Sequence, residues 1–308
     1  MHDIPVKLTG LLDLQVNGFA GVDFNSETLT VDEVEWACTE LHRESVEYFL
    51  PTLVTNDPKF TERNIRTILR ADDRNKAAIF GFHLEGPFIS PQPGARGAHP
   101  SQWTTPPNLD WVKRIQEIAE GSVRILTMSP EWEGSASFIE SVVSLGIRVA
   151  IGHTLATPQQ ISDAVKAGAT LSTHLGNGIP AMLARHPNPI WSQLAEDELW
   201  ASVIGDGFHL TKEVFQVFYH MKKGKLFLVS DSTQFAGMTP GRYHTLIGGD
   251  VVLTPEGKLH LAEDEKLFAG SAMPLKRMIE TLSQNGWLSY DAAWNLGSAA
   301  PLEYLQIR

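Results

Sequence analysis

The sequence predicts a (β/α)8 barrel, and two observations carry that prediction. Eight short apolar or β-branched runs recur along the 308 residues, and segments with a 3.6-residue apolar period lie between them. Buried strands that alternate with helices form parallel β/α units, and eight such units close a barrel. The rival is an open doubly wound sheet, which would place a Gly-x-Gly-x-x-Gly turn after the first strand. No such turn occurs there, so we favour the barrel.

The expected elements are bounded by residues typical of such boundaries. Thr30 and Thr157 precede helical periods as typical first caps, and Pro158 suits a first helical turn. The expected strands are residues 11–16, 48–55, 77–84, 123–128, 147–152, 169–174, 200–204 and 226–230. The expected helices are residues 31–43, 61–69, 111–119, 136–145, 158–167, 212–221, 274–283 and 291–305.

Residues 243–261 depart from this rhythm. They contain short strand patterns separated by hairpin turn signals. We therefore expect a β-hairpin insertion in the loop after the eighth strand, within a single catalytic barrel domain of residues 1–308. The strand patterns are 244–247, 250–253 and 258–261, and the turn signals are Gly248-Gly249 and Pro255-Glu256-Gly257.

The composition restricts the partners. A formal net charge of −11 argues against nucleic acid or an anionic membrane as a partner. No apolar run approaches the roughly 20 residues that span a membrane, and the start lacks a signal-peptide pattern. The single cysteine, Cys38, excludes a disulfide scaffold and a cysteine-based zinc cluster, and it fits a cytoplasmic protein. Any bound metal must therefore have nitrogen and oxygen ligands.

Polar side chains follow the ends of the predicted strands, where the chemistry of a barrel lies. Glu85, His153 and His174 end or follow three different strands, so a barrel would bring them to one axis. Taken alone, each histidine is more often a hydrogen-bonded structural residue, and Glu85 could be a loop carboxylate. Together, one carboxylate and two imidazoles form a common site for zinc or another divalent ion and leave a position for water. We therefore predict these three residues as metal ligands.

Other strand-end and loop residues could complete a hydrolytic site. Asp231, after the eighth strand, is placed to act as base for the water, although a helix cap or a turn would also explain it. His209 and His99 are candidates for polarising a carbonyl or holding a substrate hydroxyl, and His99 lies in a long loop rich in Gly and Pro. His83 shares a strand face with Glu85 and is expected to support the site or the fold.

Arg185 is the candidate anion-binding residue. It follows the sixth strand in a loop that also holds Asn177 and Gly178. Backbone N–H groups of a glycine turn and a bidentate guanidinium suit a phosphate. Without those neighbours Arg185 would be an ordinary surface residue, and that interpretation stays open.

Five segments around these residues carry a family resemblance. They are His83-Leu84-Glu85-Gly86-Pro87-Phe88, Gly152-His153-Thr154, Thr173-His174-Leu175-Gly176-Asn177, Asp206-Gly207-Phe208-His209 and Leu228-Val229-Ser230-Asp231. In order and spacing they resemble the N-acetylglucosamine-6-phosphate deacetylases of the amidohydrolase superfamily. Residues 13–18 and 268–271 also resemble that family's first and last signatures. The resemblance runs from about Gly10 to the C-terminus, and it is the combination that is specific.

The resemblance implies a role for each site residue. Glu85, His153 and His174 would hold one divalent metal ion per chain. Asp231 would take a proton from the attacking water and deliver it to the leaving amine, and His99 would stabilise the acetyl carbonyl. The family's substrate-contact positions are matched by Ala98, Asn177, Gly178, His209, Phe268, Ala269 and Gly270, and its phosphate-gripping arginine, usually across a homodimer interface, by Arg185.

Two departures from the family pattern shape these expectations. Gln15 and Asn17 stand where many amidohydrolases have a His-x-His pair for a second ion, so we expect a single ion. The ligand types do not choose between zinc, which we place first, and iron or another divalent ion. The chain also has no room for the family's accessory β-sandwich, and its opening Met1 favours a naturally minimal barrel.

Three functions are consistent with these residues. The first is metal-dependent hydrolysis of the N-acetyl group of N-acetylglucosamine 6-phosphate. The second is an amidohydrolase acting on a related N-acetylhexosamine, with or without phosphate, or on another N-acyl substrate. The third is a non-catalytic barrel that binds a sugar phosphate, against which the intact set Glu85, His153, His174 and Asp231 argues.

Overall fold

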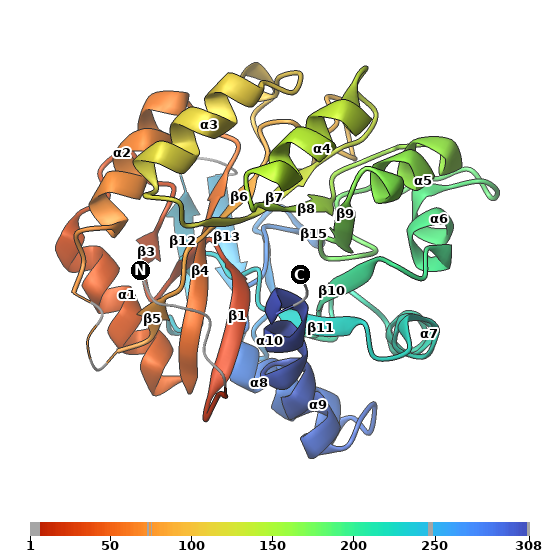
Figure 1. The fold of residues 1–308 in the computed structure, drawn as a ribbon. Coiled ribbons are helices and arrows are strands. Elements are labelled where there is room, and N and C mark those ends of the chain that lie inside the picture. Colours follow the sequence, from red (N-terminus) through yellow and green to blue (C-terminus); the bar gives the residue numbers. More distant parts are fainter. Residues whose placement is uncertain (1–6, 73, 75, 246–248, 307–308) are drawn as a thin grey trace.

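A nearly closed parallel barrel forms the centre of the fold. The computed structural model describes residues 7–306 except residues 73, 75 and 246–248. The barrel strands pair in chain order, and helices cover their outer side (Figure 1). The predicted parallel barrel is therefore confirmed. Its strands are β1 (Leu11–Val16), β4 (Val46–Val54), β6 (Phe82–Glu85), β7 (Val123–Met128), β8 (Arg148–Ile151), β9 (Ala169–Ser172), β10 (Trp200–Ile204) and β11 (Leu226–Val229).

The helices begin at the expected caps. Thr30 and Thr157 each form a capping box, with Glu33 and Gln160, so both predicted helix starts are confirmed. The helices are α1 (Val31–Arg43), α2 (Pro58–Ile68), α3 (Leu109–Ile118), α4 (Ser135–Ser144), α5 (Pro158–Lys166), α6 (Pro189–Ala195), α7 (Lys212–Lys222), α8 (Leu275–Gln284), α9 (Tyr290–Leu296) and α10 (Ala299–Gln306). A 3₁₀ turn covers Ser101–Trp103. Only α6 has no counterpart among the predicted helices, although Asn188 before Pro189 is a start signal.

One predicted strand and one predicted helix are each divided by a glycine. The strand expected at 77–84 splits at Gly81 into β5 (Ala78–Ile79) and β6. Gly81 has a φ of 144°, and a Cβ there would lie 2.4 Å from the Ser122 carbonyl oxygen, so only glycine fits. The helix expected at 291–305 splits at Gly297 into α9 and α10.

The barrel closes between β1 and β11 with help from a side chain. Asp13 Oδ1 accepts the Ser230 N–H at 3.1 Å, and the Asp231 N–H donates to the Gln15 carbonyl at 2.9 Å. A short parallel bridge follows at Ser232. A buried carboxylate therefore supplies one of the acceptors that a strand would supply in a continuous ladder.

A four-stranded antiparallel sheet lies between β11 and α8 in the chain, behind the barrel in the view of Figure 1. The sequence predicts three strands over 243–261, whereas the sheet continues to residue 268 through a fourth strand. Residues 246–248, part of the first predicted strand and turn, lie outside the described residues. The strands are β12 (Gly241–Thr245), β13 (Gly249–Leu253), β14 (Leu259–Leu261) and β15 (Asp264–Phe268), and a separate hairpin pairs β2 (Gly18–Phe19) with β3 (Val22–Asp23).

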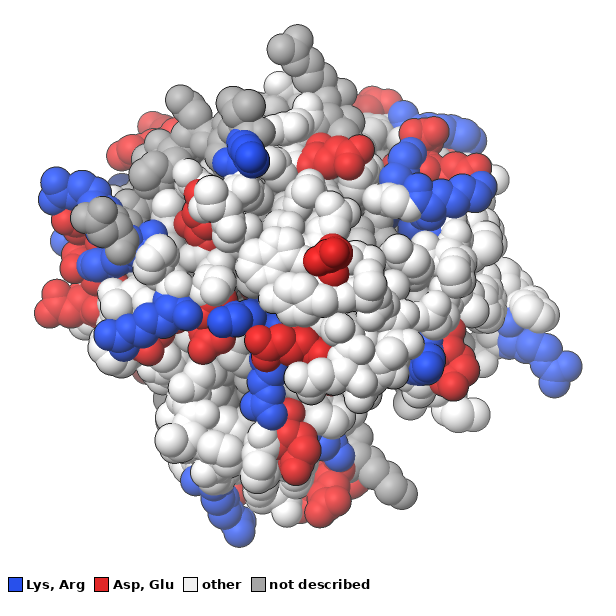
Figure 2. All heavy atoms as spheres, turned by 90° about the horizontal axis from the view of Figure 1, so that it is seen from below, with Lys and Arg blue, Asp and Glu red and all other residues white. Residues whose placement is uncertain are grey.

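Apolar side chains fill the barrel and the space under its helices, and a second, smaller cluster lies at β13 and β14. On the face seen in Figure 2, basic and acidic residues are interspersed around a largely uncharged centre. Within residues 7–306 as described, no helix is long and apolar enough to cross a membrane.

Candidate active site

The ends of four barrel strands supply the central side chains. Glu85 is the last residue of β6, whereas His153, His174 and Asp231 each lie two residues beyond β8, β9 and β11. These last three residues have positive φ values of 48°, 31° and 47°. Such a conformation costs free energy in a non-glycine residue and often marks a functional site. The barrel thus holds the backbone of these three residues in an uncommon conformation at its carboxyl end.

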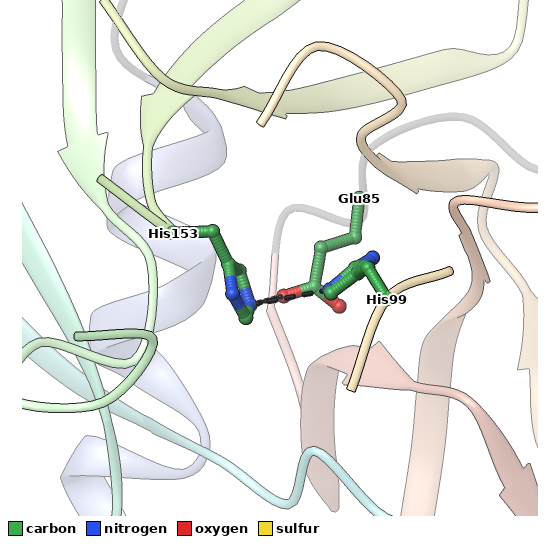
Figure 3. Close-up of side chains that lie close together, drawn as sticks. All are labelled: Glu85, His99 and His153. Atoms are coloured by element: carbon green, nitrogen blue, oxygen red, sulfur yellow. Dashed lines mark hydrogen bonds and ion pairs between the residues drawn. The ribbon is translucent and has the colours of Figure 1, made fainter. Parts of the chain in front are cut away.

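Glu85 is the centre of this cluster. Its Oε1 lies 3.1 Å from His153 Nε2 and 2.9 Å from His174 Nε2. In Figure 3 the rings of His153 and His99 approach the carboxylate from two sides. Burial acts to raise the pKa of Glu85, but the hydrogen bonds with His153 and His174 overcome it and hold that pKa well below its usual value. The structure therefore brings the three predicted metal ligands together.

The hydrogen bonds of His153 indicate that the cluster suits a cation. Its Nδ1 lies 2.9 Å from the Ala95 carbonyl oxygen, which can only accept, so Nδ1 carries a proton. In the neutral ring, Nε2 then presents a lone pair to Glu85 Oε1. Two facing acceptors need a proton or a cation to hold them together. A carboxylate beside an imidazole whose other nitrogen donates to a carbonyl is typical of divalent-metal sites, so the residues fit such an ion.

Asp231 is held by the end of β1. Gln15 Nε2 and Asn17 Nδ2 donate to its Oδ1 at 3.0 and 2.8 Å. Burial raises the pKa of Asp231 to about 6, and the nearby charge of Glu85 adds to this effect. Gln15 and Asn17 therefore orient the predicted base.

His99 joins the cluster from the loop after β6. Its Nε2 lies 3.3 Å from His153 Nε2, and its Nδ1 lies 2.9 Å from Thr55 Oγ1. Ligand atoms of Glu85, His99 and His153 lie within 4.8 Å of one another, so these three residues form a group that could hold a metal ion, and this group omits His174. Burial lowers the pKa of His99 to about 3, and His153 contributes, so the ring is neutral.

His83 lies inside the barrel rather than in the cluster. Its Nδ1 is 3.0 Å from the Leu14 carbonyl oxygen and its Nε2 is 2.7 Å from Thr127 Oγ1. Burial lowers its pKa to about 4. A neutral ring with both nitrogens engaged connects three strands, which agrees with the expected supporting role.

His209 and Phe268 lie together at the same end of the barrel. His209 Nδ1 is 2.6 Å from Asp206 Oδ2, and Asp206 Oδ1 accepts the N–H groups of Phe208 and His209. The Phe268 ring, at the end of β15, has its centroid 4.9 Å from that of His209. The antiparallel sheet therefore carries one predicted substrate-contact residue to the loop after β10.

The other predicted substrate residues differ in exposure. Ala98 and Arg185 are exposed, and no ion pair of Arg185 occurs within the described part of the chain. Asn177 donates to the His174 carbonyl at 3.3 Å. A Cβ at Gly178 would lie 3.0 Å from His153 Nδ1, so the absent side chain lets this loop pack on the imidazole. Ala269 and Gly270 are partly buried.

A cavity of about 600 Å³ adjoins this cluster, between the end of β4 and the loop after β6. Thr55 and Gly86 line it, but Glu85, His153 and His174 do not. The cavity is therefore beside the cluster and not the space between its ligand atoms.

Comparison with known proteins decides the family. No protein-family model matches the chain. The chain is 31% identical to the N-acetylglucosamine-6-phosphate deacetylase of Bacillus subtilis (strain 168), over 88% of this chain and 68% of that protein. It is also 31% identical to the Homo sapiens N-acetylglucosamine-6-phosphate deacetylase, over 96% of this chain and 73% of that protein. The chain belongs to the N-acetylglucosamine-6-phosphate deacetylase family.

Solved members of this deacetylase family have the same fold. The Mycobacterium smegmatis enzyme superimposes with a TM-score of 0.80 at 28% identity, over 94% of this chain and 74% of that one. The Pasteurella multocida enzyme superimposes with a TM-score of 0.81 at 25% identity, over 96% of this chain and 76% of that one. A D-hydantoinase, 12% identical with a TM-score of 0.54, shares the fold alone. The family resemblance of the motifs is therefore confirmed.

Three residues that contact the site residues are missing from the set predicted from the sequence. Thr55 ends the expected strand 48–55, so its position at a strand end could have revealed it. Asp206 lies in a segment that matches the family, but its residue type alone does not disclose that it orients His209. Ala95 acts through its backbone carbonyl, which no side-chain pattern reveals.

Proposed function

We propose that this chain hydrolyses the N-acetyl group of N-acetylglucosamine 6-phosphate, releasing acetate and glucosamine 6-phosphate. The observation that carries the proposal is the meeting of His153 and His174 at one oxygen of Glu85, in a chain of this deacetylase family. A solved M. smegmatis relative, an aspartate-to-alanine variant, is in complex with N-acetyl-D-glucosamine-6-phosphate. This relative supports a phosphosugar as the substrate.

We assign one divalent ion per chain to Glu85, His153 and His174, with zinc first and iron or another divalent ion as alternatives. When bound, such an ion polarises a carbonyl and makes a coordinated water more acidic. The side-chain NH2 groups of Gln15 and Asn17 donate to Asp231. Since an amide is a poor metal ligand, these two residues support a single ion.

Asp231 is the proposed proton carrier. Its Oδ1 accepts hydrogen bonds from two side-chain amide groups, so we assign Oδ2 to take the proton of the attacking water. A pKa of about 6 leaves most of the carboxylate ionised near neutral pH, yet able to return a proton. That proton passes to the leaving nitrogen as the C–N bond breaks, so acetate and a free amine result.

The remaining residues are assigned to substrate binding. His99 would hold the acetyl carbonyl and His209 the sugar, while Arg185 would bind the 6-phosphate, from a second copy of the chain in a homodimer. The proposed enzyme acts in the cytoplasm as one catalytic unit, with β12–β15 as an insertion in the last barrel loop. The further sugar contacts are Ala98, Asn177, Gly178, Phe268, Ala269 and Gly270.

A second candidate substrate is N-acetylgalactosamine 6-phosphate. The chain is 28% identical to the N-acetylgalactosamine-6-phosphate deacetylase of Escherichia coli O157:H7, over 100% of this chain and 82% of that protein. The two sugars differ only in the orientation of one hydroxyl. Residues that contact the sugar ring therefore decide between the two substrates. The ion and Asp231 act on the acetamido group, which the two sugars share, and do not distinguish them.

The test is acetate release from both phosphosugars and from unphosphorylated N-acetylglucosamine, with and without a chelator. We expect chelator-sensitive turnover of N-acetylglucosamine 6-phosphate, with kcat/KM at least tenfold above that for the galacto isomer. A preference for the galacto isomer would establish the second candidate. Turnover that survives complete removal of metal would contradict the proposed site.

A further inference from the structure

We infer that Lys258 binds the 6-phosphate of the substrate, from the same chain that holds the reacting acetyl group. This role rests on the proposed function and adds a residue to its phosphate site, to which Arg185 is assigned from a second copy. Lys258 lies in the turn between β13 and β14, directly before β14, and belongs to none of the segments that resemble the family. The contacts of its side chain in the folded protein indicate the role.

Lys258 lies against an aromatic ring of the candidate site. Its Nζ lies over the Phe268 ring, 5.6 Å from the ring centroid, and that centroid lies 4.9 Å from the centroid of the His209 ring. The Ala269 N–H donates to the Leu259 carbonyl at 3.2 Å, which holds the start of β14 against the end of β15. Phe268 and His209 are both proposed sugar contacts. A single ring therefore separates the ammonium group from a second proposed sugar contact.

The segment that carries Phe268 is also joined to the proposed proton carrier. The N–H and the hydroxyl of Thr233, two residues after Asp231, donate to the Ser271 carbonyl at 2.9 and 3.0 Å. Contacts therefore run from the Asp231 segment to the Phe268 segment, and from Phe268 to Lys258. Asp231 acts at the acetamido group on carbon 2 of the sugar, whereas the phosphate is attached at carbon 6. Such a succession of residues suits a ligand with these two groups at separate positions of one ring.

The ammonium group of Lys258 has donors available for an anion. A contact with a ring face attracts a cation but leaves its three N–H donors unused. The Lys258 side chain is only partly buried and Phe268 is 40% exposed, so a ligand can reach both. Because the ring already restrains the ammonium, less side-chain freedom is lost on binding. In the described part of the chain Lys258 forms no ion pair, and the lysines that do are Lys76, Lys166 and Lys225.

The charge of the whole chain makes such a local cation important. The formal net charge of −11 repels an anionic substrate, so phosphate binding requires positive charge placed at the site. The antiparallel sheet places Lys258 there, and an apolar cluster that includes Leu259 and Phe235 fixes the sheet beside the segment after β11. The insertion between β11 and α8 is therefore a substrate-binding element.

The experiment measures binding of glucosamine 6-phosphate to the zinc-loaded protein by titration calorimetry. Lys258→Met keeps an apolar side chain on Phe268 and removes the charge. We expect it to raise the Kd about tenfold, as for one lost hydrogen bond to a charged group. Lys258→Arg should restore most of the affinity. Lys225→Met, directly before β11 and so at the opposite end of the barrel, is the matched control and should leave the Kd unchanged.

Inorganic phosphate, used as a competitor, separates the phosphate from the sugar. We expect its inhibition constant to rise in Lys258→Met by the same factor of about ten, because the lost contact is to the phosphate. An inhibition constant that stays the same, with a raised Kd for glucosamine 6-phosphate, would place Lys258 on the sugar and overturn the inference.

An unchanged Kd for glucosamine 6-phosphate in Lys258→Met would also overturn the inference. Failure of the natural protein to bind either phosphate compound would overturn it together with the proposed phosphate site. Acetate release is measured separately and reports on the reaction. Binding that depends on Lys258, in a protein that releases no acetate from N-acetylglucosamine 6-phosphate, would uphold the inference and overturn the proposed reaction.

Discussion

Asp231 has the most demanding task in the proposed reaction, because one carboxylate must accept a proton and later return it. The structure gives it two features that suit this task. Its backbone is held at a φ of 47°, and Gln15 and Asn17 donate to a single one of its oxygens. Burial, which raises its pKa to about 6, brings that pKa nearer to neutral pH than in water.

Replacing Asp231 with asparagine should separate binding from chemistry. We expect Asp231→Asn to retain one metal ion per chain and to lose ~10²–10⁴ in kcat, since general acid–base help is of that size. Metal content by elemental analysis and acetate release measure the two effects. An unchanged kcat would remove Asp231 from the reaction.

Asn17 should contribute to the rate through Asp231 alone. Asn17→Ala removes the 2.8 Å donor to Oδ1, and a hydrogen bond to a charged group contributes ~1.5–3 kcal/mol. We therefore expect kcat to fall at least tenfold while KM and metal content stay the same. Asn285→Ala, at the end of α8, is the control. Loss of the ion in Asn17→Ala would instead make Asn17 a ligand.

At the scale of elements, the contact between β1 and β11 is unusual because a buried carboxylate, that of Asp13, takes part in its hydrogen bonds. Burial raises the pKa of Asp13 to about 7, and its hydrogen bonds with Ser230 only partly oppose this. The folded protein therefore binds a proton at Asp13 more tightly than the unfolded chain, whose aspartates titrate near 3.9. The stability from this group is present below that value and is lost as the pH rises toward 7.

Asp13→Asn should remove this pH dependence. An amide oxygen still accepts the Ser230 N–H, but no proton is released as the pH rises. Relative to the variant, we expect the natural protein to lose a few kcal/mol in free energy of unfolding between pH 4 and 8. Urea unfolding of both proteins, zinc-loaded, measures this. Parallel stability curves would show that Asp13 does not titrate in this range.

At the scale of the whole molecule, the segment between β9 and α6 stands out. Arg185 is exposed in it, Met182 is 88% exposed, and Trp191, on α6, is 49% exposed. Exposed apolar residues beside an arginine without an ion pair among the described residues support the proposal that this segment meets a second copy. The phosphate would then be bound across the contact.

Arg185→Ala tests phosphate recognition at this scale. We expect KM for N-acetylglucosamine 6-phosphate to rise about 10- to 100-fold, as for a lost hydrogen bond to a charged group, with little change in kcat. Arg114→Ala, on α3, where Arg114 pairs with Glu62 of α2, should leave KM unchanged. If the KM of Arg185→Ala equals the KM of Arg114→Ala, Arg185 is an ordinary surface residue.

Much of the fold follows from local sequence. The apolar runs that lie between the helical periods identify all eight barrel strands. Thr30 and Thr157 identify two helix starts. The division at Gly81 does not follow, because it depends on the approach of the Ser122 carbonyl from another segment. The fourth strand of the antiparallel sheet, β15, likewise depends on pairing with β14.

For the candidate site, the sequence by itself determined which residue types end which strands. A carboxylate and two imidazoles at Glu85, His153 and His174 sufficed to predict a cluster, because parallel strands of a barrel end on one side. Only the tertiary structure decided that Gln15 and Asn17 hold Asp231, and that Thr55 engages His99. These contacts join residues far apart in the chain, and their geometry depends on backbone positions that residue type does not encode.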